Sequence, residues 1–170
     1  MATDDRFTAG DELEAGSLQA YLHGIMMKSE LNEGRGAYQI SNAVLAASGP
    51  SFGPIQYDLG SNEDGRTLFN TIAGTAVDAD GNRIIDDATL TSIQTSLFKP
   101  FNQYTDDDWA LYETVKPQMD RALDSEVGRE AINQDYLALL DKKVEALDTF
   151  IDGIENPDNQ AFMRGNTMAQ

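Results

Sequence analysis

The sequence contains no cysteine, which excludes disulfide bonds, thiolate nucleophiles and zinc sites built on cysteine. Its one histidine, His23, follows Leu22 in a helical pattern, so we expect it to be packed or partly exposed rather than to serve as the base of a catalytic triad. Basic residues are also few, 12 against 29 acidic ones, for a net charge of −17. Without a basic patch, binding to nucleic acid or to an anionic membrane surface is disfavoured.

Long apolar runs are missing too. No stretch approaches the roughly 20 residues that a membrane-spanning helix needs, and residues 1–5 lack the basic and apolar regions of a secretory signal. We therefore expect a protein that stays in the cytoplasm, one that leaves by a route the sequence does not display, or a segment of a longer chain. The 170 residues, 41% of them hydrophobic, are enough for one domain with a sizeable core.

The acidity is most simply a solvated surface that aids solubility. It is also compatible with a cationic substrate, a basic protein partner or a high-salt habitat. Residues 78–82, Asp-Ala-Asp-Gly-Asn, have the composition of a calcium loop, but the spacing of their glycine does not fit one. We expect a surface turn there, and neither a metal nor another cofactor.

Helical periodicity covers most of the chain. Apolar residues recur at helical spacing over residues 12–32, and two glycines, Gly34 and Gly36, end that pattern. Further helices are predicted over residues 63–73 and 87–98, with Asp87 as a plausible N-cap of the second.

Two more helices follow. Thr105 and Asp108 resemble a capping box before a helix to about residue 124, in which Pro117 should introduce a kink or a break. An apolar strip of about two and a half heptads from Leu137 to Ile154 predicts a core helix rather than a coiled-coil seam. Residues 1–11 and 155–170 are polar, and we expect them to be mobile.

Between the first two helices the pattern is extended. Residues 37–40 predict a short strand, residues 42–47 a helical turn, and residues 51–59 an irregular extended segment. In a strand, Gln56 and Asp58 would share one face. The fold class is therefore α+β, mostly α: a single domain over residues 1–170, with a small extended or β lobe at about 35–60 packed on a helical bundle.

The chemistry-bearing residues cluster around this lobe. Glu33 ends the first helical pattern, and a partly buried carboxyl group there could have a raised pKa and act as a general acid. Glu30, on the same helical face, is its competitor. Ser51, Gln56 and Asp58 are candidates for the opposite wall, which in a glycosidase carries a second polar group. The alternatives are exposed helix-end carboxylates for Glu33 and Glu30, a turn or cap role for Asp58, and local turn bonding for Ser51.

Aromatic and amide side chains of the lobe are candidate glycan contacts. Tyr38, Phe52 and Tyr57 could line a sugar cleft or equally form the core of the lobe, with Tyr38 the first choice for the cleft. Gln39 and Asn62 are the candidate polar substrate contacts.

Asn32-Glu33-Gly34, Tyr38 and Ser51-Phe52-Gly53 together resemble a diverged form of the phage-type lysozyme (muramidase) signature, and residues 51–56 are similar to the Gly-x-x-Gln element of lytic transglycosylases. The resemblance implies a lysozyme-like fold and a hydrolase that cleaves β-1,4 linkages of bacterial peptidoglycan, a cell-wall-degrading and antimicrobial activity. Glu33 then matches the general acid, Ser51 the threonine that positions a water, and Gln56 the transglycosylase glutamine. The family's aspartate has no match, and Asp58 is its candidate substitute.

Two alternatives stay open. Chitosanases share the broad fold and act on a cationic glycan, which the net charge of −17 suits, and residues 33–36 are similar to their Asp-Gly-Arg-Gly element. A non-catalytic acidic binding protein, such as an inhibitor, an immunity-type protein or a virion component with a basic partner, is favoured by the charge and by the apolar strip of residues 137–154.

Overall fold

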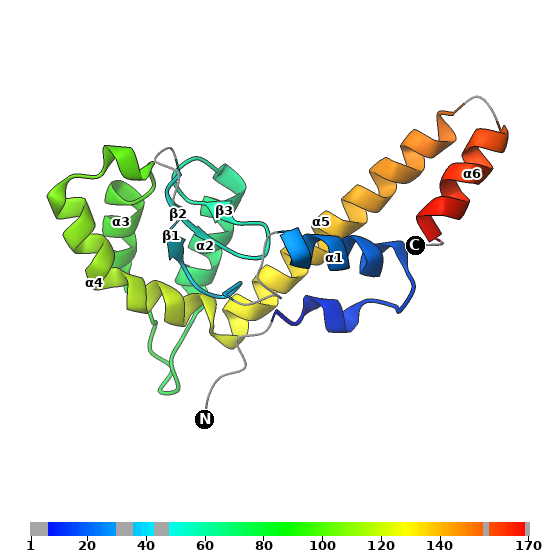
Figure 1. Cartoon of the computed structure of the whole chain (residues 1–170). Helices are drawn as coiled ribbons and strands as arrows, with labels where there is room; N and C mark the ends of the chain where they lie inside the picture. The colour runs from blue at the N-terminus through cyan, green and yellow to red at the C-terminus, as the bar shows by residue number, and fades with distance from the viewer. Residues whose placement is uncertain (1–6, 30–35, 43–47, 155–156, 169–170) are drawn as a thin grey trace.

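The computed structural model of the chain describes residues 7–29, 36–42, 48–154 and 157–168 (Figure 1). The mostly α, α+β class is confirmed: a small antiparallel sheet accompanies a set of helices. The elements in chain order are η1 (Ala9–Glu12), α1 (Leu18–Ser29), β1 (Ser41–Asn42), β2 (Pro50–Phe52), β3 (Tyr57–Asp58), α2 (Glu63–Thr75), α3 (Asp87–Ser96), η3 (Phe101–Gln103), α4 (Asp106–Leu123), α5 (Glu126–Asp152) and α6 (Pro157–Met168).

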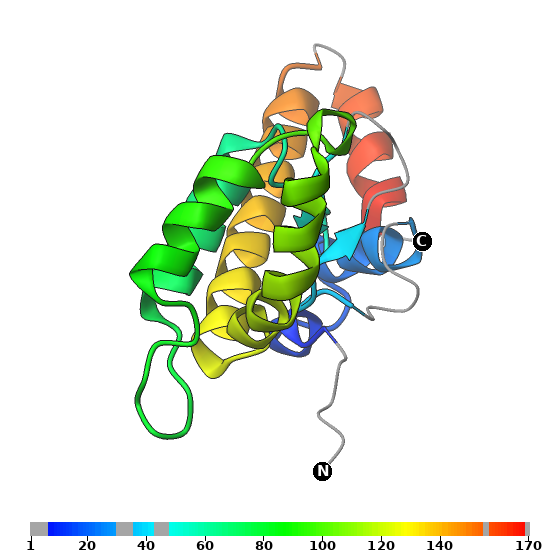
Figure 2. The same cartoon turned by 90° about the vertical axis from the view of Figure 1, so that its left-hand side faces the viewer.

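The long helix α5 organises the molecule. Its first half packs against α2 and α4, α1 crosses its middle, and α6 folds back along its outer half (Figures 1 and 2). The sheet lies beside α2, between this helical body and the end of α1 (Figure 1). None of the helices in the described ranges is both long and apolar enough to cross a membrane.

The sheet differs from the expected extended segments. Residues 36–38 form a turn rather than a strand, and pairing begins only at Ser41, which lies opposite Ser51. Residues 51–59 are not one strand: β2 and β3 form a hairpin around a turn over residues 53–56, which Gly53 opens with a φ of 77°. Gln56 therefore lies in the turn and does not share a strand face with Asp58, whose partner across the hairpin is Ser51. Most of the helical turn expected at 42–47 lies outside the described residues.

The helices follow their local signals closely. Asn62 caps α2, and both halves of the expected capping box of Thr105 and Asp108 are present at the start of α4. The predicted N-cap of α3, Asp87, is wrong by one residue. Asp86 caps the helix, and its carboxylate accepts the N–H of Thr89 at 2.7 Å. Pro117 does not divide α4, which continues through it.

The described residues nearest both ends of the chain, residues 7–11 and 157–168, belong to the folded structure, contrary to expectation. The helix expected over 12–32 is α1, preceded by η1, and its predicted last residues lie outside the described ranges. Phe7 and Ala9 are buried in the core, so residues 7–11 are not a frayed end. The segment 157–168 forms α6 rather than a mobile tail, because the guanidinium of Arg164 binds Asp148 at 3.0 Å and Asp152 at 2.7 Å on α5.

One continuous core joins the sheet to the helices. Its largest buried side chains are Tyr38, Phe52, Leu59, Phe69, Ile72, Ile85, Ile93, Leu97, Tyr112, Met119, Leu123 and Tyr136. Only the first part of the apolar strip of α5 behaves as the expected core helix: Leu140 lies in this core and Leu137 at its margin. Ile151 is buried outside this cluster, and Val144, Leu147 and Ile154 are half-buried. The hairpin is thereby fixed against α2, so that its turn faces α5.

Candidate functional site

The expected general acid and its competitor, Glu33 and Glu30, lie outside the described residues. The chain on either side of them is defined: α1 ends at Ser29, and Gly36 opens a turn. Within that turn, the carbonyl of Ala37 accepts the N–H of Gly53 at 2.9 Å. The segment that follows Glu33 in sequence is therefore bound to the first residue of the hairpin turn.

Gln56 ends the hairpin turn in an unusual conformation. Its φ of 55° lies in the left-handed region, which no other non-glycine residue of the described ranges adopts. This conformation costs a residue with a Cβ about 1–2 kcal/mol. The Ser41 hydroxyl donates to Gln56 Oε1 at 2.9 Å, and Gln56 Nε2 makes only a long 3.4 Å bond to the Gly53 carbonyl. Strain at a polar residue held in this way favours a functional role.

The Asp58 side chain links the loop that precedes β2 to the loop that follows β3. One carboxylate oxygen accepts the N–H of Gly49 at 2.9 Å and that of Gly60 at 2.6 Å, and the other accepts the Ser61 hydroxyl at 3.1 Å. A Cβ on Gly49 would lie 2.7 Å from the nitrogen of Gly60, so only glycine permits this approach. One oxygen thus holds backbone N–H groups and the other holds the Ser61 side chain, which corresponds to the turn role that the sequence left open.

Ser51 is enclosed in the same way. Its side chain is 2% exposed, and its hydroxyl donates to the Gly49 carbonyl at 3.2 Å. This is the local turn bonding that was the alternative to a water-positioning role.

The candidate glycan contacts divide into core and surface. Tyr38 is 2% exposed, its hydroxyl donates to Asn133 at 2.7 Å, and the guanidinium of Arg129 lies 4.3 Å from its ring centre. Phe52 is fully buried against the rings of Tyr57 and Phe69. Tyr38 and Phe52 are therefore core side chains.

Two further candidates reach the surface. Gln39 is exposed. Asn62 caps α2 and lines a groove between α2 and α5.

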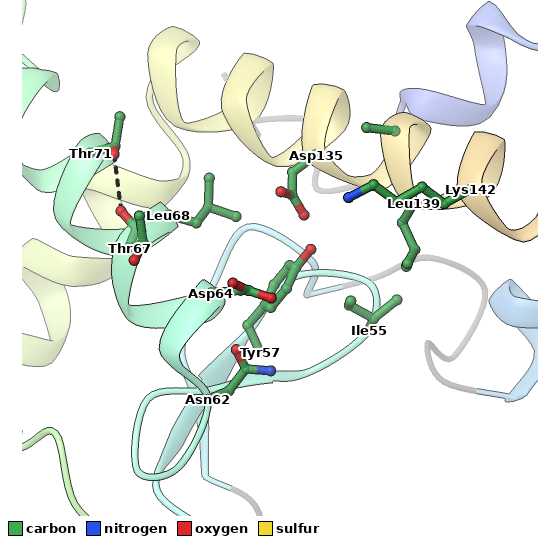
Figure 3. A pocket seen from close by; sticks show the side chains of 11 residues that line it. Ile55, Tyr57, Asn62, Asp64, Thr67, Leu68, Thr71, Asp135, Leu139 and Lys142 are labelled. Atoms are coloured by element: carbon green, nitrogen blue, oxygen red, sulfur yellow. Dashed lines mark hydrogen bonds between the residues drawn. The ribbon is translucent and has the colours of Figure 1, made fainter.

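A groove of about 440 Å³ opens between α2, α5 and the hairpin turn, and we call it the α2–α5 groove (Figure 3). Its volume falls within the range of ligand pockets. A hollow of about 290 Å³ shares Ile55 and Leu139 with it and extends to Met26, three residues before the end of α1. The groove is lined by Ile55, Tyr57, Asn62, Asp64, Thr67, Leu68, Thr71, Asp135, Ala138, Leu139 and Lys142.

The polar side chains of the α2–α5 groove are not paired with one another. Tyr57 is only 6% exposed, yet its hydroxyl points into the groove and finds no hydrogen-bond partner within the part of the chain that the structure describes (Figure 3). Over the same residues, Asp64, Asp135 and Lys142 form no ion pair. Partial burial raises the pKa of Asp135, and the positive charge of Lys142 opposes this shift.

Sequence reasoning missed most of this groove. Asp64 and Asp135 are 71 positions apart and meet only because α2 packs on α5. A local pattern exists on α5, where residues 135, 138, 139 and 142 follow helical spacing on one face. That pattern mixes charged and apolar residues, so it does not distinguish a groove wall from an ordinary amphipathic margin.

Two other titratable features belong to the structure of the molecule. His23 packs near Phe7, its Nδ1 lies 3.0 Å from the Tyr136 hydroxyl, and burial lowers its pKa while Asp11 acts in the opposite direction. Asp78 accepts the N–H groups of Asp80 and Asn82 in a surface turn. Among the described residues, no group of three or more acidic or histidine side chains is placed to hold a metal ion.

Comparison of the chain with protein-family models, with curated proteins and with solved structures finds no match. The case for a function therefore rests on the residues and the geometry described above.

Proposed function

We propose that this chain is a lysozyme-like glycoside hydrolase that cleaves β-1,4 linkages of bacterial peptidoglycan, with Glu33 as the general acid. The observation that carries the proposal is the hydrogen bond from Gly53 to Ala37, 2.9 Å long. It binds the chain four residues after Glu33 to the turn that ends at Gln56. Glycosidases canonically use two carboxyl groups across the scissile bond. In this proposal Glu33 is the one carboxyl group, and the amide of Gln56 takes the opposite position and orients water.

The overall arrangement supports the same proposal. A small antiparallel sheet follows the first long helix, and the remaining helices follow the sheet, as a lysozyme-like fold with two lobes requires. The hollow at Met26 and Ile55 connects the last turn of α1 to the α2–α5 groove, so an extended glycan would have a continuous surface to occupy.

Within this proposal the hairpin residues have different tasks. Glu33 protonates the glycosidic oxygen as the C–O bond breaks, and its carboxylate then accepts the proton of the water that adds to the anomeric carbon. Gln56 orients that water or the sugar. The hydrogen bond from Ser41 fixes the orientation of the Gln56 amide. Asp58 and Ser51 hold the backbone of the hairpin and are positioning residues, because their polar atoms already bind the loop.

A clearing assay on purified peptidoglycan tests the proposal, with Glu33→Gln as the variant and Glu30→Gln as its matched control. We expect wild type and Glu30→Gln to clear the suspension and release reducing-end muropeptides, identified by mass spectrometry. Glu33→Gln should lose about 10²–10⁴-fold in rate, the usual contribution of a general acid, with an unchanged melting temperature.

Two results would contradict the proposal. Activity retained in Glu33→Gln but lost in Glu30→Gln would move the acid to Glu30. No clearing by folded wild-type protein would reject the peptidoglycan hydrolase itself.

A further inference from the structure

The α2–α5 groove has the construction of a ligand site rather than of a packing defect. Its volume of about 440 Å³ suits a small ligand, and it opens to solvent beside the hairpin turn. Ile55, Leu68 and Leu139 give it an apolar wall. Carboxylate, amide, hydroxyl and ammonium groups stand around that wall (Figure 3). An apolar wall ringed by polar groups matches a sugar ring, which has apolar faces and a polar edge.

Tyr57 is the observation that points to a ligand. Tyr57 is 6% exposed, and its hydroxyl is directed into the groove without a protein partner in the described ranges (Figure 3). The ring is buried, whereas the hydroxyl oxygen reaches the solvent of the groove, since no buried side-chain oxygen among the described residues lacks a partner. A bound molecule with a polar group at this position would replace water at a hydroxyl whose ring is already held in place.

The charges around Tyr57 indicate the sign of that molecule. Asp135 of α5 points toward the Tyr57 hydroxyl, and Asp64 of α2 lines the same groove near the Tyr57 ring (Figure 3). Lys142 supplies one positive charge, so the wall retains a net charge of −1. Burial already disfavours the ionised form of Asp135, and a cation in the groove would offset that cost.

We propose that the α2–α5 groove is a subsite for a hexosamine unit with a free primary ammonium group. Asp135 and Asp64 would bind the ammonium group, Tyr57 would bind a ring hydroxyl, and the apolar wall would cover one face of the ring. An N-acetylated unit carries a neutral amide in the same place, so the negative charge of the two carboxylates would not be neutralised. The inference deepens the proposed glycosidase function and rests on it for the continuity of the glycan chain.

Two polymers carry this chemistry. One is a chitosan-type chain of glucosamine, and the other is peptidoglycan whose glucosamine has lost its acetyl groups. Binding of short oligosaccharides tests the shared chemistry, and turnover of the two polymers distinguishes the sources.

The binding experiment uses the full chain carrying Glu33→Gln, so that no glycan is cleaved during titration. Calorimetric titration at a fixed ionic strength compares the tetramer of glucosamine with that of N-acetylglucosamine. We expect the glucosamine tetramer to bind about tenfold more tightly, since one charge-assisted contact contributes about that factor.

Three further substitutions locate the site. Asp135→Asn should abolish the preference for the glucosamine tetramer, and Tyr57→Phe should weaken both tetramers. Glu130→Gln removes an exposed carboxylate on another face of α5 and should change neither affinity. Equal binding of the two tetramers, or equal effects of Asp135→Asn and Glu130→Gln, would overturn the proposal.

The experiments can reject the subsite without rejecting the proposed function, and the reverse. The expected binding pattern without cleavage of any peptidoglycan would keep the subsite and reject the hydrolase. Clearing of peptidoglycan by wild type, with tetramer binding that the groove substitutions do not alter, would keep the hydrolase and reject the subsite. Faster cleavage of deacetylated than of native peptidoglycan would assign the site to the cell wall, and cleavage of chitosan alone would assign it to a glucosamine polymer.

Discussion

Substitution of Asp58 separates a structural carboxylate from a catalytic one. The carboxylate accepts hydrogen bonds from Gly49, Gly60 and Ser61, and the first two donors are backbone N–H groups of buried glycines. Asp58→Ala removes both acceptor oxygens, and with them all three hydrogen bonds, and leaves two backbone N–H groups without a partner. Asp58→Asn keeps one carbonyl oxygen, which can still accept from both glycines, and loses the charge and the oxygen that accepts the Ser61 hydroxyl.

The size of each effect follows from these bonds. A hydrogen bond to a charged group contributes about 1.5–3 kcal/mol, and a buried donor left without a partner costs about 1–3 kcal/mol. We therefore expect Asp58→Ala to lower the free energy of unfolding by about 3–5 kcal/mol. Asp58→Asn should cost about 1–2 kcal/mol, the difference between charged and neutral hydrogen bonds of this kind.

Urea unfolding followed by circular dichroism measures both variants, and the clearing assay measures their activity. Asp58→Asn should clear peptidoglycan at close to the wild-type rate wherever it is folded. The reasoning is refuted if Asp58→Ala lowers the free energy of unfolding by less than about 1 kcal/mol, because the three hydrogen bonds would then contribute little to stability. A stable Asp58→Asn protein without activity would show instead that the carboxylate takes part in the chemistry.

Two further predictions concern packing and pH. A Cβ on Gly128 would lie 2.3 Å from the Ala122 carbonyl oxygen, so Gly128→Ala should lower the free energy of unfolding by more than about 3 kcal/mol, whereas Gly24→Ala, with no atom within 4 Å, should raise it by about 0.5–1 kcal/mol. Similar melting temperatures for these two variants would contradict the packing at the α4–α5 corner. Because burial lowers the pKa of His23, the unfolded chain binds the proton more readily, and stability should fall as the pH drops through about 6.5. Urea midpoints at pH 7.5 and pH 5.5 should differ for wild type and agree for His23→Gln, and a wild type without this difference would remove the basis of the prediction.

The elements that the sequence predicts well are those whose cause is local. The capping box of Thr105 and Asp108 and the apolar spacing of α2 act within a few residues, and the structure shows both. Pro117 shows the limit of a local rule: tertiary packing on α2, α3 and α5 keeps α4 helical across a residue that breaks an isolated helix.

The elements that the sequence misses depend on contacts far along the chain. α6 is polar and has little apolar pattern, and it is held partly by Arg164 bound to two carboxylates on α5. The hairpin turn is set by Gly53 and Gln56 in left-handed conformations, and glutamine is not a residue that signals this conformation. The groove carboxylates Asp64 and Asp135 become neighbours only when α2 packs on α5, which no spacing in the sequence expresses.

The net charge of −17 gains a specific meaning from the α2–α5 groove. A surface charge that only aids solubility would act on any ligand through the general field of the protein, which salt screens over about 8 Å at physiological ionic strength. The carboxylates of Asp64 and Asp135 line the same groove as the Tyr57 hydroxyl, where a bound ligand would be in direct contact, closer than the screening distance, and hydrogen-bond geometry decides which ligand fits. General attraction would therefore weaken in salt for every cationic glycan alike. The preference for a free amine over its acetylated form arises only in the groove and should persist.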